Sequence, residues 1–323
     1  MAERARRHGP LGYDEVVELA LYHPELGFYQ RGGGAGRGGA DFLTSPEVGP
    51  LFGAVLATAI DRWWAELGRP DPITVVEVGA GRGTLARAVL AAARAPLRYV
   101  AVERSAALRA LHPTGVEPAA ALPDGPFVGV ILANELLDNL PFALLERTAD
   151  GWAEVRVDQD LSEVLVPAPA LGPEAPLGAR IPVQRQAAAW VDDARSRLLA
   201  GRVVAVDYCD VTASLARRPW TDWVRTYRGH GRGGHPLADL GAQDVTCEVA
   251  VDQLPPPTDN RSQAEFLRAF GLDGLVDDAR RAWEERAHIG DLQALATRSR
   301  VHEGAALTDP DGLGRFRVLE WVV

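Results

Sequence analysis

The chain has 323 residues, 47% of them hydrophobic and 24% charged, and this composition excludes a disordered or collagen-like protein. Its formal net charge of −10 at pH 7 argues against a protein that coats nucleic acid or an anionic membrane. The two cysteines, Cys209 and Cys247, have no metal-ligand spacing, so we expect neither a disulfide framework nor a bound metal.

Residues 1–70 are predicted to form a helical segment interrupted by a glycine-rich loop. Apolar residues at helical spacing predict a helix over 12–22. Residues 31–42 read RGGGAGRGGADF, a stretch too rich in glycine to pack a core, and predict a mobile loop. A second helical region is predicted over 46–67, with a proline near its start and Gly68 at its end.

Strands and helices alternate through the next part of the chain. This alternation is typical of a doubly wound, mostly parallel sheet, so the predicted fold class is α/β with a Rossmann-like core over 71–210. Residues 144–182 interrupt it as inserted antiparallel strands that end in a proline-rich connection. Strands are expected at 73–78, 98–103, 127–133 and 202–208, and helices at 83–93, 105–111 and 187–200.

The last third of the chain has a weaker pattern. Residues 211–300 begin with an irregular stretch to 261, rich in Gly, Pro, His and Arg, of the kind that holds functional loops. Two helices are predicted after it, over 262–271 and 273–297. The closing FRVLEWVV, residues 316–323, predicts a strand that completes the sheet.

The expected location is cytoplasmic, without membrane contact. No run approaches the roughly 18 apolar residues of a membrane span. The basic N-terminus is not followed by the apolar stretch of a secretory signal.

The sequence VVEVGAGRGT, residues 75–84, carries glycines at alternate positions directly after a predicted strand. In open α/β sheets ligands bind at the carboxyl ends of the strands. Gly79 and Gly81 permit a tight turn and a close approach of backbone to ligand. Ala80, Gly83 and Thr84 complete the turn and start the next helix, whose N–H groups would face the bound molecule.

Two acidic residues decide which ligand the loop favours. Glu77, at the end of the first strand, would repel a pyrophosphate but suits an ammonium or sulfonium cation. Glu103 ends the next strand, where a carboxylate can accept hydrogen bonds from ribose hydroxyls. S-adenosylmethionine carries both cations, so it is the predicted cofactor. A dinucleotide such as NAD is the alternative, and it would make the protein an oxidoreductase.

Seven segments in order along the chain are similar to one protein family. They are LYHPELGFYQ (21–30), DFLTSPEVGPLFG (41–53), VVEVGAGRGTL (75–85), ANELLDNLPF (133–142), VDYCDV (206–211), VRTYRGHGRGGHPLADLGAQDVTCEV (224–249) and SQAEFLRAFGL (262–272). The set resembles the MidA-like methyltransferases, whose signature is ANE-x-x-D-x-x-P. This family includes a mitochondrial complex I assembly methyltransferase that modifies an arginine of a partner subunit.

The resemblance implies a class I methyltransferase fold, S-adenosylmethionine as cofactor, and substrate-side elements over 211–300. It also implies that Thr44 and Ser45 fold over the cofactor as part of a lid. Three positions depart from the family pattern on the predicted substrate side: Cys209 for a glycine, Glu248 for a histidine, and Pro182 for a glutamate.

Four residues are predicted to serve the methyl-transfer step. Glu135 and Asp138 lie three apart, so one helical turn would place both carboxylates on the same side, where they could hold an amine or guanidinium. Asn134 would lie between cofactor and nucleophile, and Asp207 would line the cleft from another strand. The methyl acceptor is expected to be a protein or peptide, an arginine in particular, or a small molecule. The alternative hypothesis is a non-catalytic assembly protein that binds the cofactor.

Overall fold

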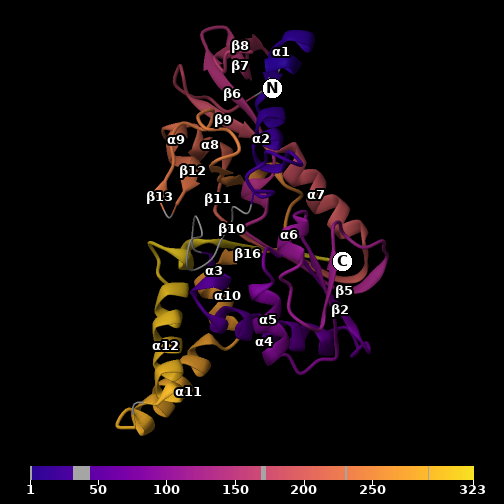
Figure 1. Ribbon diagram of the computed structural model, residues 1–323, viewed down its shortest axis with the longest axis vertical. Coiled ribbons are helices and arrows are strands. Elements are labelled where there is room, and N and C mark those ends of the chain that lie inside the picture. The colour runs from indigo at the N-terminus through magenta and orange to yellow at the C-terminus, as the bar shows by residue number, and fades with distance from the viewer. Residues whose placement is uncertain (1, 32–43, 169–171, 230, 290) are drawn as a thin grey trace. The chain divides into compact units, whose positions relative to one another are not determined.

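The computed structural model describes residues 2–31, 44–168, 172–229, 231–289 and 291–323 (Figure 1). Apart from Arg31, the predicted glycine-rich loop lies outside these residues. The chain divides into two compact units, each built from three segments. The first unit comprises Met1–Phe42, Leu136–Asp193 and Asp207–Pro256, and the second comprises Leu43–Glu135, Ala194–Val206 and Pro257–Val323.

A seven-stranded sheet forms the centre of the second unit, with the strand order β16-β17-β10-β5-β2-β3-β4. From β10 to β4 all neighbours pair in parallel, whereas β16 and β17 are antiparallel. This mostly parallel sheet confirms the predicted fold class. The strands are β2 (Ile73–Val78), β3 (Leu97–Val102), β4 (Val116–Ala119), β5 (Phe127–Asn134), β10 (Leu198–Asp207), β16 (Asp259–Ser262) and β17 (Arg317–Val322).

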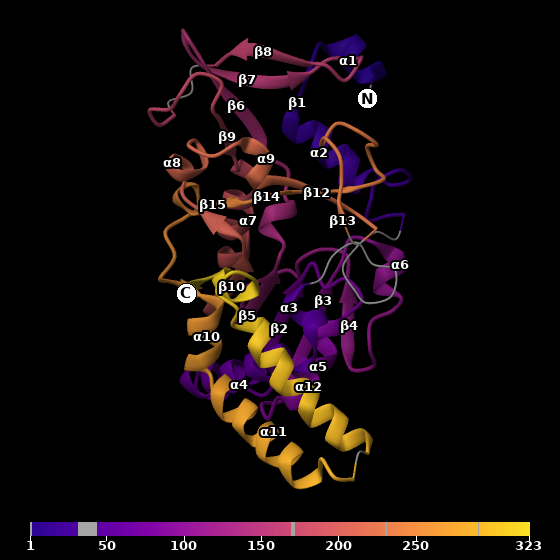
Figure 2. The same ribbon diagram turned by 90° about the vertical axis from the view of Figure 1, so that its left-hand side faces the viewer.

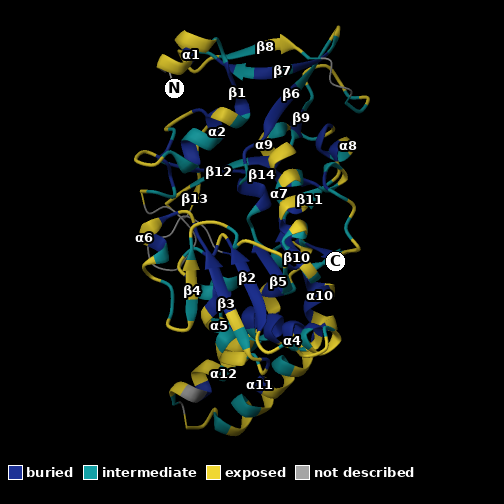
Figure 3. Cartoon of the chain, turned by 90° about the vertical axis from the view of Figure 1, so that its right-hand side faces the viewer, coloured by how far each residue is buried: buried dark blue, intermediate teal, exposed yellow. Residues whose placement is uncertain are grey.

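Burial explains why the central strands are apolar runs without alternation. Every residue of β2 is buried, because both faces of a central parallel strand are covered (Figure 3). The C-terminal strand β17 lies between β10 and β16 in this sheet, and Val323, directly after it, exchanges two backbone hydrogen bonds with Gly201.

The helices of the second unit differ from prediction in two places. The helices are α3 (Ser45–Val48), α4 (Pro50–Glu66), α5 (Thr84–Ala92), α6 (Ala106–Arg109), α10 (Gln263–Ala269), α11 (Leu272–Arg286) and α12 (Leu292–Leu307). The single helix predicted over 273–297 is two, α11 and α12, which pack against each other (Figure 2).

The helix predicted over 46–67 is interrupted at Gly49. A Cβ on Gly49 would lie 2.1 Å from the carboxyl carbon of Glu303, so only glycine fits there. Glu303 is buried and accepts the Leu51 N–H at 3.0 Å, which satisfies a donor at the start of α4. The break therefore provides the place where α12 caps α4.

The first unit contains a five-stranded antiparallel sheet and two smaller sheets. The five strands are β1 (Leu11–Gly12), β6 (Ala143–Thr148), β7 (Gly151–Val157), β8 (Glu163–Pro167) and β9 (Arg180–Val183). The smaller sheets pair β11 (Cys209–Asp210) with β15 (Val249–Ala250), and β12 (Val224–Arg228) with both β13 (Gly231–Arg232) and β14 (Asp244–Cys247). The irregular region predicted after residue 210 is thus partly regular.

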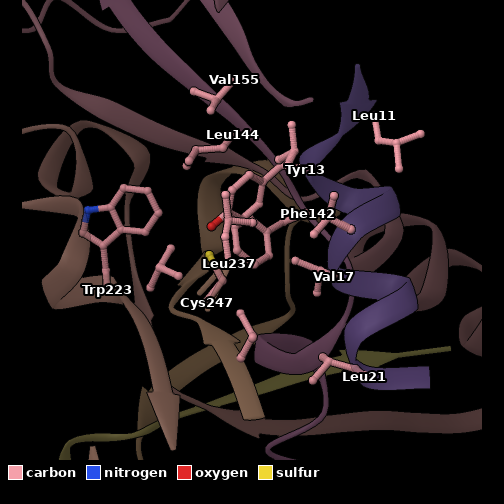
Figure 4. Close-up of a cluster of buried hydrophobic side chains, with 14 of the residues drawn as sticks. Leu11, Tyr13, Val17, Leu21, Phe142, Leu144, Val155, Trp223, Leu237 and Cys247 are labelled. Carbon is pink, nitrogen blue, oxygen red and sulfur yellow. The ribbon is translucent and has the colours of Figure 1, made fainter. Parts of the chain in front are cut away.

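Helix α2 (Tyr13–Tyr22) packs its apolar side into the main core of the first unit (Figure 4). The core includes Leu11, Tyr13, Val17, Leu21, Phe142, Leu144, Val155, Trp223, Leu237 and Cys247. The remaining α-helices of the described ranges are α1 (Ala2–His8), α7 (Arg185–Ser196), α8 (Thr212–Leu215) and α9 (Trp220–Trp223). Helix α7 corresponds to the helix predicted over 187–200, whereas α8 and α9 lie in the stretch predicted to be irregular. Within the described ranges, no helix combines the length and the apolar character that a membrane crossing requires.

Candidate functional site

The glycine loop follows β2 directly and uses left-handed backbone at all three glycines. The φ angles are +73° at Gly79, +52° at Gly81 and +74° at Gly83, a region that side chains other than glycine rarely adopt. The N–H groups of Gly79 and Ala80 both donate to the Val102 carbonyl at 3.0 Å, which ties the loop to the end of β3. The sequence pattern therefore reflects a real backbone requirement.

The loop is open on one side and packed on the other. A Cβ on Gly81 would meet no atom within 4 Å, so the backbone there can be approached closely. A Cβ on Gly83 would lie 2.7 Å from Cδ of Pro113, because that proline packs on the loop. Thr84 begins α5 directly after the loop.

Glu103 lies beside the open part of the loop. Its Oε2 accepts the Gly81 N–H at 3.0 Å and its Oε1 accepts the Ser105 N–H at 2.8 Å. Burial raises the pKa of this carboxyl, and the two N–H donors partly offset that rise. Each oxygen keeps a further lone pair that a hydroxyl could use.

Glu77 lies in the buried strand β2 with only 5% of its surface exposed. Its Oε2 accepts the hydroxyl of Tyr99 at 2.7 Å, and the backbone N–H of Ala86 in α5 also donates to the carboxylate. Burial raises the pKa of Glu77 to about 7. These contacts make Glu77 a support beneath the loop and the start of α5. Its predicted attraction for a cation remains a prediction.

Thr44 and Ser45 are buried in the same unit as the glycine loop. Ser45 begins α3, which contacts α5. Its hydroxyl donates to Oε1 of Gln263 at 2.8 Å, and Gln263 donates to the Leu307 carbonyl at 3.0 Å. Ser45 is therefore held in a protein hydrogen-bond network, while its lid role stays a prediction.

Strand β5 ends in a strained turn next to β2. Glu135 has a φ of +50°, and its N–H donates to the Val206 carbonyl at 2.8 Å. Asn134 donates from Nδ2 to Oε1 of Glu135 at 3.1 Å. The Oδ1 of Asn134 is buried and has no hydrogen-bond partner among the residues that the structure describes. An orphaned acceptor at a strand end marks a place where a ligand donor fits.

Together these features fit S-adenosylmethionine. The open backbone at Gly81, the hydroxyl-accepting carboxylate of Glu103 and the orphaned amide oxygen of Asn134 all lie at the carboxyl ends of β2, β3 and β5. Within the described ranges, no group of three or more His, Cys, Asp or Glu side chains could hold a metal ion.

Three buried aspartates, Asp138, Asp207 and Asp244, form an acid cluster in the first unit. Oδ2 of Asp207 accepts the N–H groups of Leu137 at 2.9 Å and of Asp138 at 3.3 Å, which fixes the short helix η1 (Leu137–Asn139). Oδ1 of Asp244 accepts the hydroxyl of Tyr29 at 3.0 Å.

Asp138 differs from the other two members of the acid cluster. It is 4% exposed, and its Oδ1 has no hydrogen-bond partner in the part of the chain that the structure describes. Burial raises the pKa of Asp138 well above its ordinary value, the charges of Asp207 and Asp244 raise it further, and Arg225 offsets this only in part. The buried Oδ1 of Asp138 could therefore accept a hydrogen bond from a cationic donor.

The predicted helical turn that would pair Glu135 with Asp138 does not form. The short helix begins at Leu137, and Glu135 precedes it in left-handed backbone. The two residues also belong to different units. The correction follows from the strained strand end, which the three-residue spacing does not reveal.

The three residues that depart from the family pattern each contact other residues of the first unit. Glu248 is buried and forms ion pairs with Arg218, at an N–O distance of 2.9 Å, and with Arg225, at 3.8 Å. Cys209 contacts the Asp207 carbonyl at 3.5 Å. Pro182 lies in β9, where its carbonyl accepts Nε2 of Gln253 at 2.8 Å.

Several residues at these sites were not predicted as functional. They are Tyr29, Tyr99, His112, Asn139 and Asp244. Asp244 lies in a segment that resembles the family, so its position carried a signal. Tyr29 and Asn139 also lie in such segments, 21–30 and 133–142. Tyr99 and His112 lie outside all seven segments, and only the fold brings them to the site.

Comparison with known proteins supports the cofactor assignment. Residues 55–268 match the model of a family described as S-adenosyl-L-methionine-dependent methyltransferases. A crystal structure of a methyltransferase-like protein from Burkholderia thailandensis, bound to S-adenosyl-homocysteine, is similar with a TM-score of 0.83 and 27% identity. The similarity covers 100% of this chain and 90% of that one. A second structure of a Burkholderia thailandensis protein has a TM-score of 0.81 and 26% identity.

The curated relatives correct the predicted location. The mitochondrial protein arginine methyltransferase NDUFAF7 of Danio rerio is 25% identical over 85% of this chain and 76% of its own length. The Homo sapiens protein of the same name is 24% identical over 82% of this chain and 71% of its own length. Since both names place these proteins in mitochondria, the expectation of a cytoplasmic location is wrong.

Proposed function

The chain belongs to the S-adenosyl-L-methionine-dependent methyltransferases, and from this membership we propose that it methylates a nitrogen of a protein side chain, an arginine guanidinium in particular. Two independent facts support this acceptor. Relatives that match more than four fifths of the chain are named as protein arginine methyltransferases. The chain also has a buried acid cluster in which Oδ1 of Asp138 has no hydrogen-bond partner among the described residues, and a carboxyl oxygen of this kind can accept from a guanidinium.

The acid cluster is the observation that carries the proposal. Burying three carboxyls together is unfavourable unless a cation compensates them. Arg225 offsets the effect on Asp138 only in part, as the raised pKa of that carboxyl shows. A guanidinium would ionise Asp138 on binding and would supply the donors that its Oδ1 lacks.

S-adenosylmethionine would supply a methyl group bound to a sulfonium sulfur; the acceptor nitrogen would form a bond to the methyl carbon as the C–S bond breaks, and S-adenosyl-homocysteine would leave. The nitrogen loses one proton during the transfer, and a carboxylate that binds the acceptor would contribute by taking it. We assign that proton to Oδ1 of Asp138. Asp207 acts as a positioning residue, because its carboxylate fixes the turn that carries Asp138.

The cofactor is assigned to the second unit. The backbone of Gly79, Ala80, Gly81, Gly83 and Thr84 would approach it closely, and Glu103 would accept its ribose hydroxyls. The orphaned oxygen of Asn134 would accept a donor from the cofactor or the acceptor, and Glu135 holds the Asn134 amide in place.

The test is transfer of an isotopically labelled methyl group from S-adenosylmethionine to a panel of acceptors. The panel contains arginine-bearing peptides and proteins of the host, matched peptides with lysine in place of arginine, free arginine and small amines. Label on a guanidinium nitrogen of a peptide or protein, located by mass spectrometry, is the expected result. Label on small molecules alone would replace the proposed acceptor. Binding of S-adenosyl-homocysteine without label on any acceptor would favour a non-catalytic protein.

A further inference from the structure

Side chains contact both backbone polar groups of Gly81, its N–H and its carbonyl. Glu103 accepts its N–H at 3.0 Å, as described above. On the other end, Nε2 of His112 lies 3.0 Å from the Gly81 carbonyl oxygen. A carbonyl oxygen can only accept, so Nε2 carries the proton in this contact. One residue of the loop, the one whose side toward a ligand is open, is therefore clamped by a carboxylate and an imidazole.

His112 and its neighbour also cover the glycine that ends the loop. A Cβ on Gly83 would lie 3.4 Å from Cδ2 of His112 and 2.7 Å from Cδ of Pro113. The ring of His112 thus contacts the Gly81 carbonyl and occupies space that a side chain at position 83 would need. The fixed backbone of Pro113 places the ring against the loop.

The other ring nitrogen has no structural task. Nδ1 of His112 is buried without a hydrogen-bond partner in the described ranges. A buried polar atom that lacks a partner lowers stability, so a ring that served packing alone would be better replaced by an apolar side chain. The donor at Nε2 is what distinguishes histidine from an apolar residue at this position.

From these contacts we propose that His112 is a positioning residue of the cofactor site. Its Nε2 donor sets the orientation of the Gly81 carbonyl group. Three glycines give this loop many accessible conformations, and each residue that binding must order reduces affinity. His112 removes part of that disorder before the cofactor arrives. It acts on the loop and not on the reacting groups.

Binding of S-adenosyl-homocysteine, measured by titration calorimetry, tests the proposal without any methyl acceptor. Its outcome is therefore independent of whether the acceptor is arginine. The variant His112→Leu removes the donor, and His112→Gln keeps an amide donor at the same number of bonds from Cα. We expect Kd to rise about 3- to 10-fold in His112→Leu, the size of one lost hydrogen bond, and to stay within about 2-fold in His112→Gln.

Two further variants secure the test. His112→Asn has the same amide one bond shorter, so it cannot reach the Gly81 carbonyl and should weaken binding as His112→Leu does. If His112→Leu does not fold, the comparison of His112→Gln with His112→Asn decides. The control His235→Leu replaces an exposed histidine of the first unit and should leave Kd unchanged. The proposal would be overturned if all three His112 variants kept the wild-type Kd for S-adenosyl-homocysteine. It would also be overturned if His112→Gln and His112→Asn lost the same affinity.

Discussion

The two units carry sites of opposite character. In the second unit, the glycine loop has partners for its backbone before any ligand binds: Val102, Glu103 and His112 each hold part of it. In the first unit, the acid cluster brings three buried carboxyls together, and within the described ranges Oδ1 of Asp138 has no hydrogen-bond partner. A loop whose backbone already has partners is preorganised for its ligand, whereas a buried carboxyl oxygen without a partner gains a hydrogen bond when a cationic donor binds.

This contrast predicts that cofactor affinity and turnover can be separated by mutation. The largest expected effect is that of Asp138→Asn, which keeps the shape of the side chain but cannot take up the proton. We expect kcat to fall about 10²- to 10⁴-fold, the usual contribution of a positioned proton acceptor. The Kd for S-adenosyl-homocysteine should not change. Stability should hold or increase, because a buried carboxyl among like charges is removed.

The measurement pairs methyl transfer to the identified acceptor with calorimetric titration of S-adenosyl-homocysteine. Asp150→Asn is the matched control, since Asp150 is an exposed aspartate of the same unit. It should leave both quantities unchanged. A parallel loss of cofactor affinity and turnover in Asp138→Asn would remove the distinction between the two sites.

Glu77 tests whether the buried carboxylate of the second unit is a structural support. Its pKa of about 7 in the folded protein lies above its ordinary value of 4.5, mainly because of burial. Its contribution to stability is therefore fully present below pH 4.5 and is lost as the pH rises through 7. Relative to Glu77→Gln, the wild type should lose on the order of 3 kcal/mol of unfolding free energy over that interval.

Urea unfolding of both proteins at several pH values between 4.5 and 8 provides the measurement. Glu103 also has a raised pKa and its charge acts on Glu77, so the double variant with Glu103→Gln measures the coupling between the two carboxyls. Glu77→Gln should weaken S-adenosylmethionine and S-adenosyl-homocysteine alike if Glu77 acts through the loop. A selective loss of S-adenosylmethionine would show that the charge of Glu77 acts on the sulfonium.

The same contrast explains what the sequence could predict. The cofactor side is built from consecutive strands and turns of one parallel sheet, so a local motif with three glycines and two glutamates described it. The acid cluster joins residues near positions 29, 138, 207 and 244, which only the fold brings together. Asp138 and Asp207 were found because motifs contain them. Tyr29 also lies in a family-like segment, but nothing in that segment indicates its contact with Asp244. The left-handed turn at Glu135 is likewise not visible in the spacing of its neighbours.

Gly83→Ala tests how far the loop depends on its backbone. An alanine there must adopt a φ of +74° with its Cβ against Pro113, so we expect a loss of about 2 kcal/mol of stability and weaker binding of S-adenosyl-homocysteine. Gly68→Ala is the control, because Gly68 has a φ of +81° but open space around its Cβ. It should lower stability by a similar backbone strain without affecting the cofactor. Equal effects of both variants on binding would mean that the strain alone, and not the loop contact, is responsible.

The smallest expected effect compares two tyrosines of the first unit. Tyr29 donates to Asp244 of the acid cluster at 3.0 Å, whereas the buried hydroxyl of Tyr13 has no partner within the described residues. Removing a made hydrogen bond should cost about 1 kcal/mol, so Tyr29→Phe should be destabilised by that amount. Tyr13→Phe should be unchanged or stabilised by about 1 kcal/mol, because it removes an unsatisfied buried group.

Turnover gives these two variants a second readout. Tyr29→Phe should lower kcat a few-fold. Asp244 would still accept the hydrogen bond from Nδ2 of Asn139, but it would lose the one from Tyr29. Because the charge of Asp244 raises the pKa of Asp138, this loss would reach the proposed proton acceptor. Tyr13→Phe should leave kcat unchanged, since its ring stays in the apolar core (Figure 4). Chemical denaturation and initial rates on the same preparations separate the two effects. If Tyr29→Phe lost stability at unchanged kcat, the hydroxyl would serve the framework alone, and Asp244 would be a structural neighbour of Asp138 without influence on its proton.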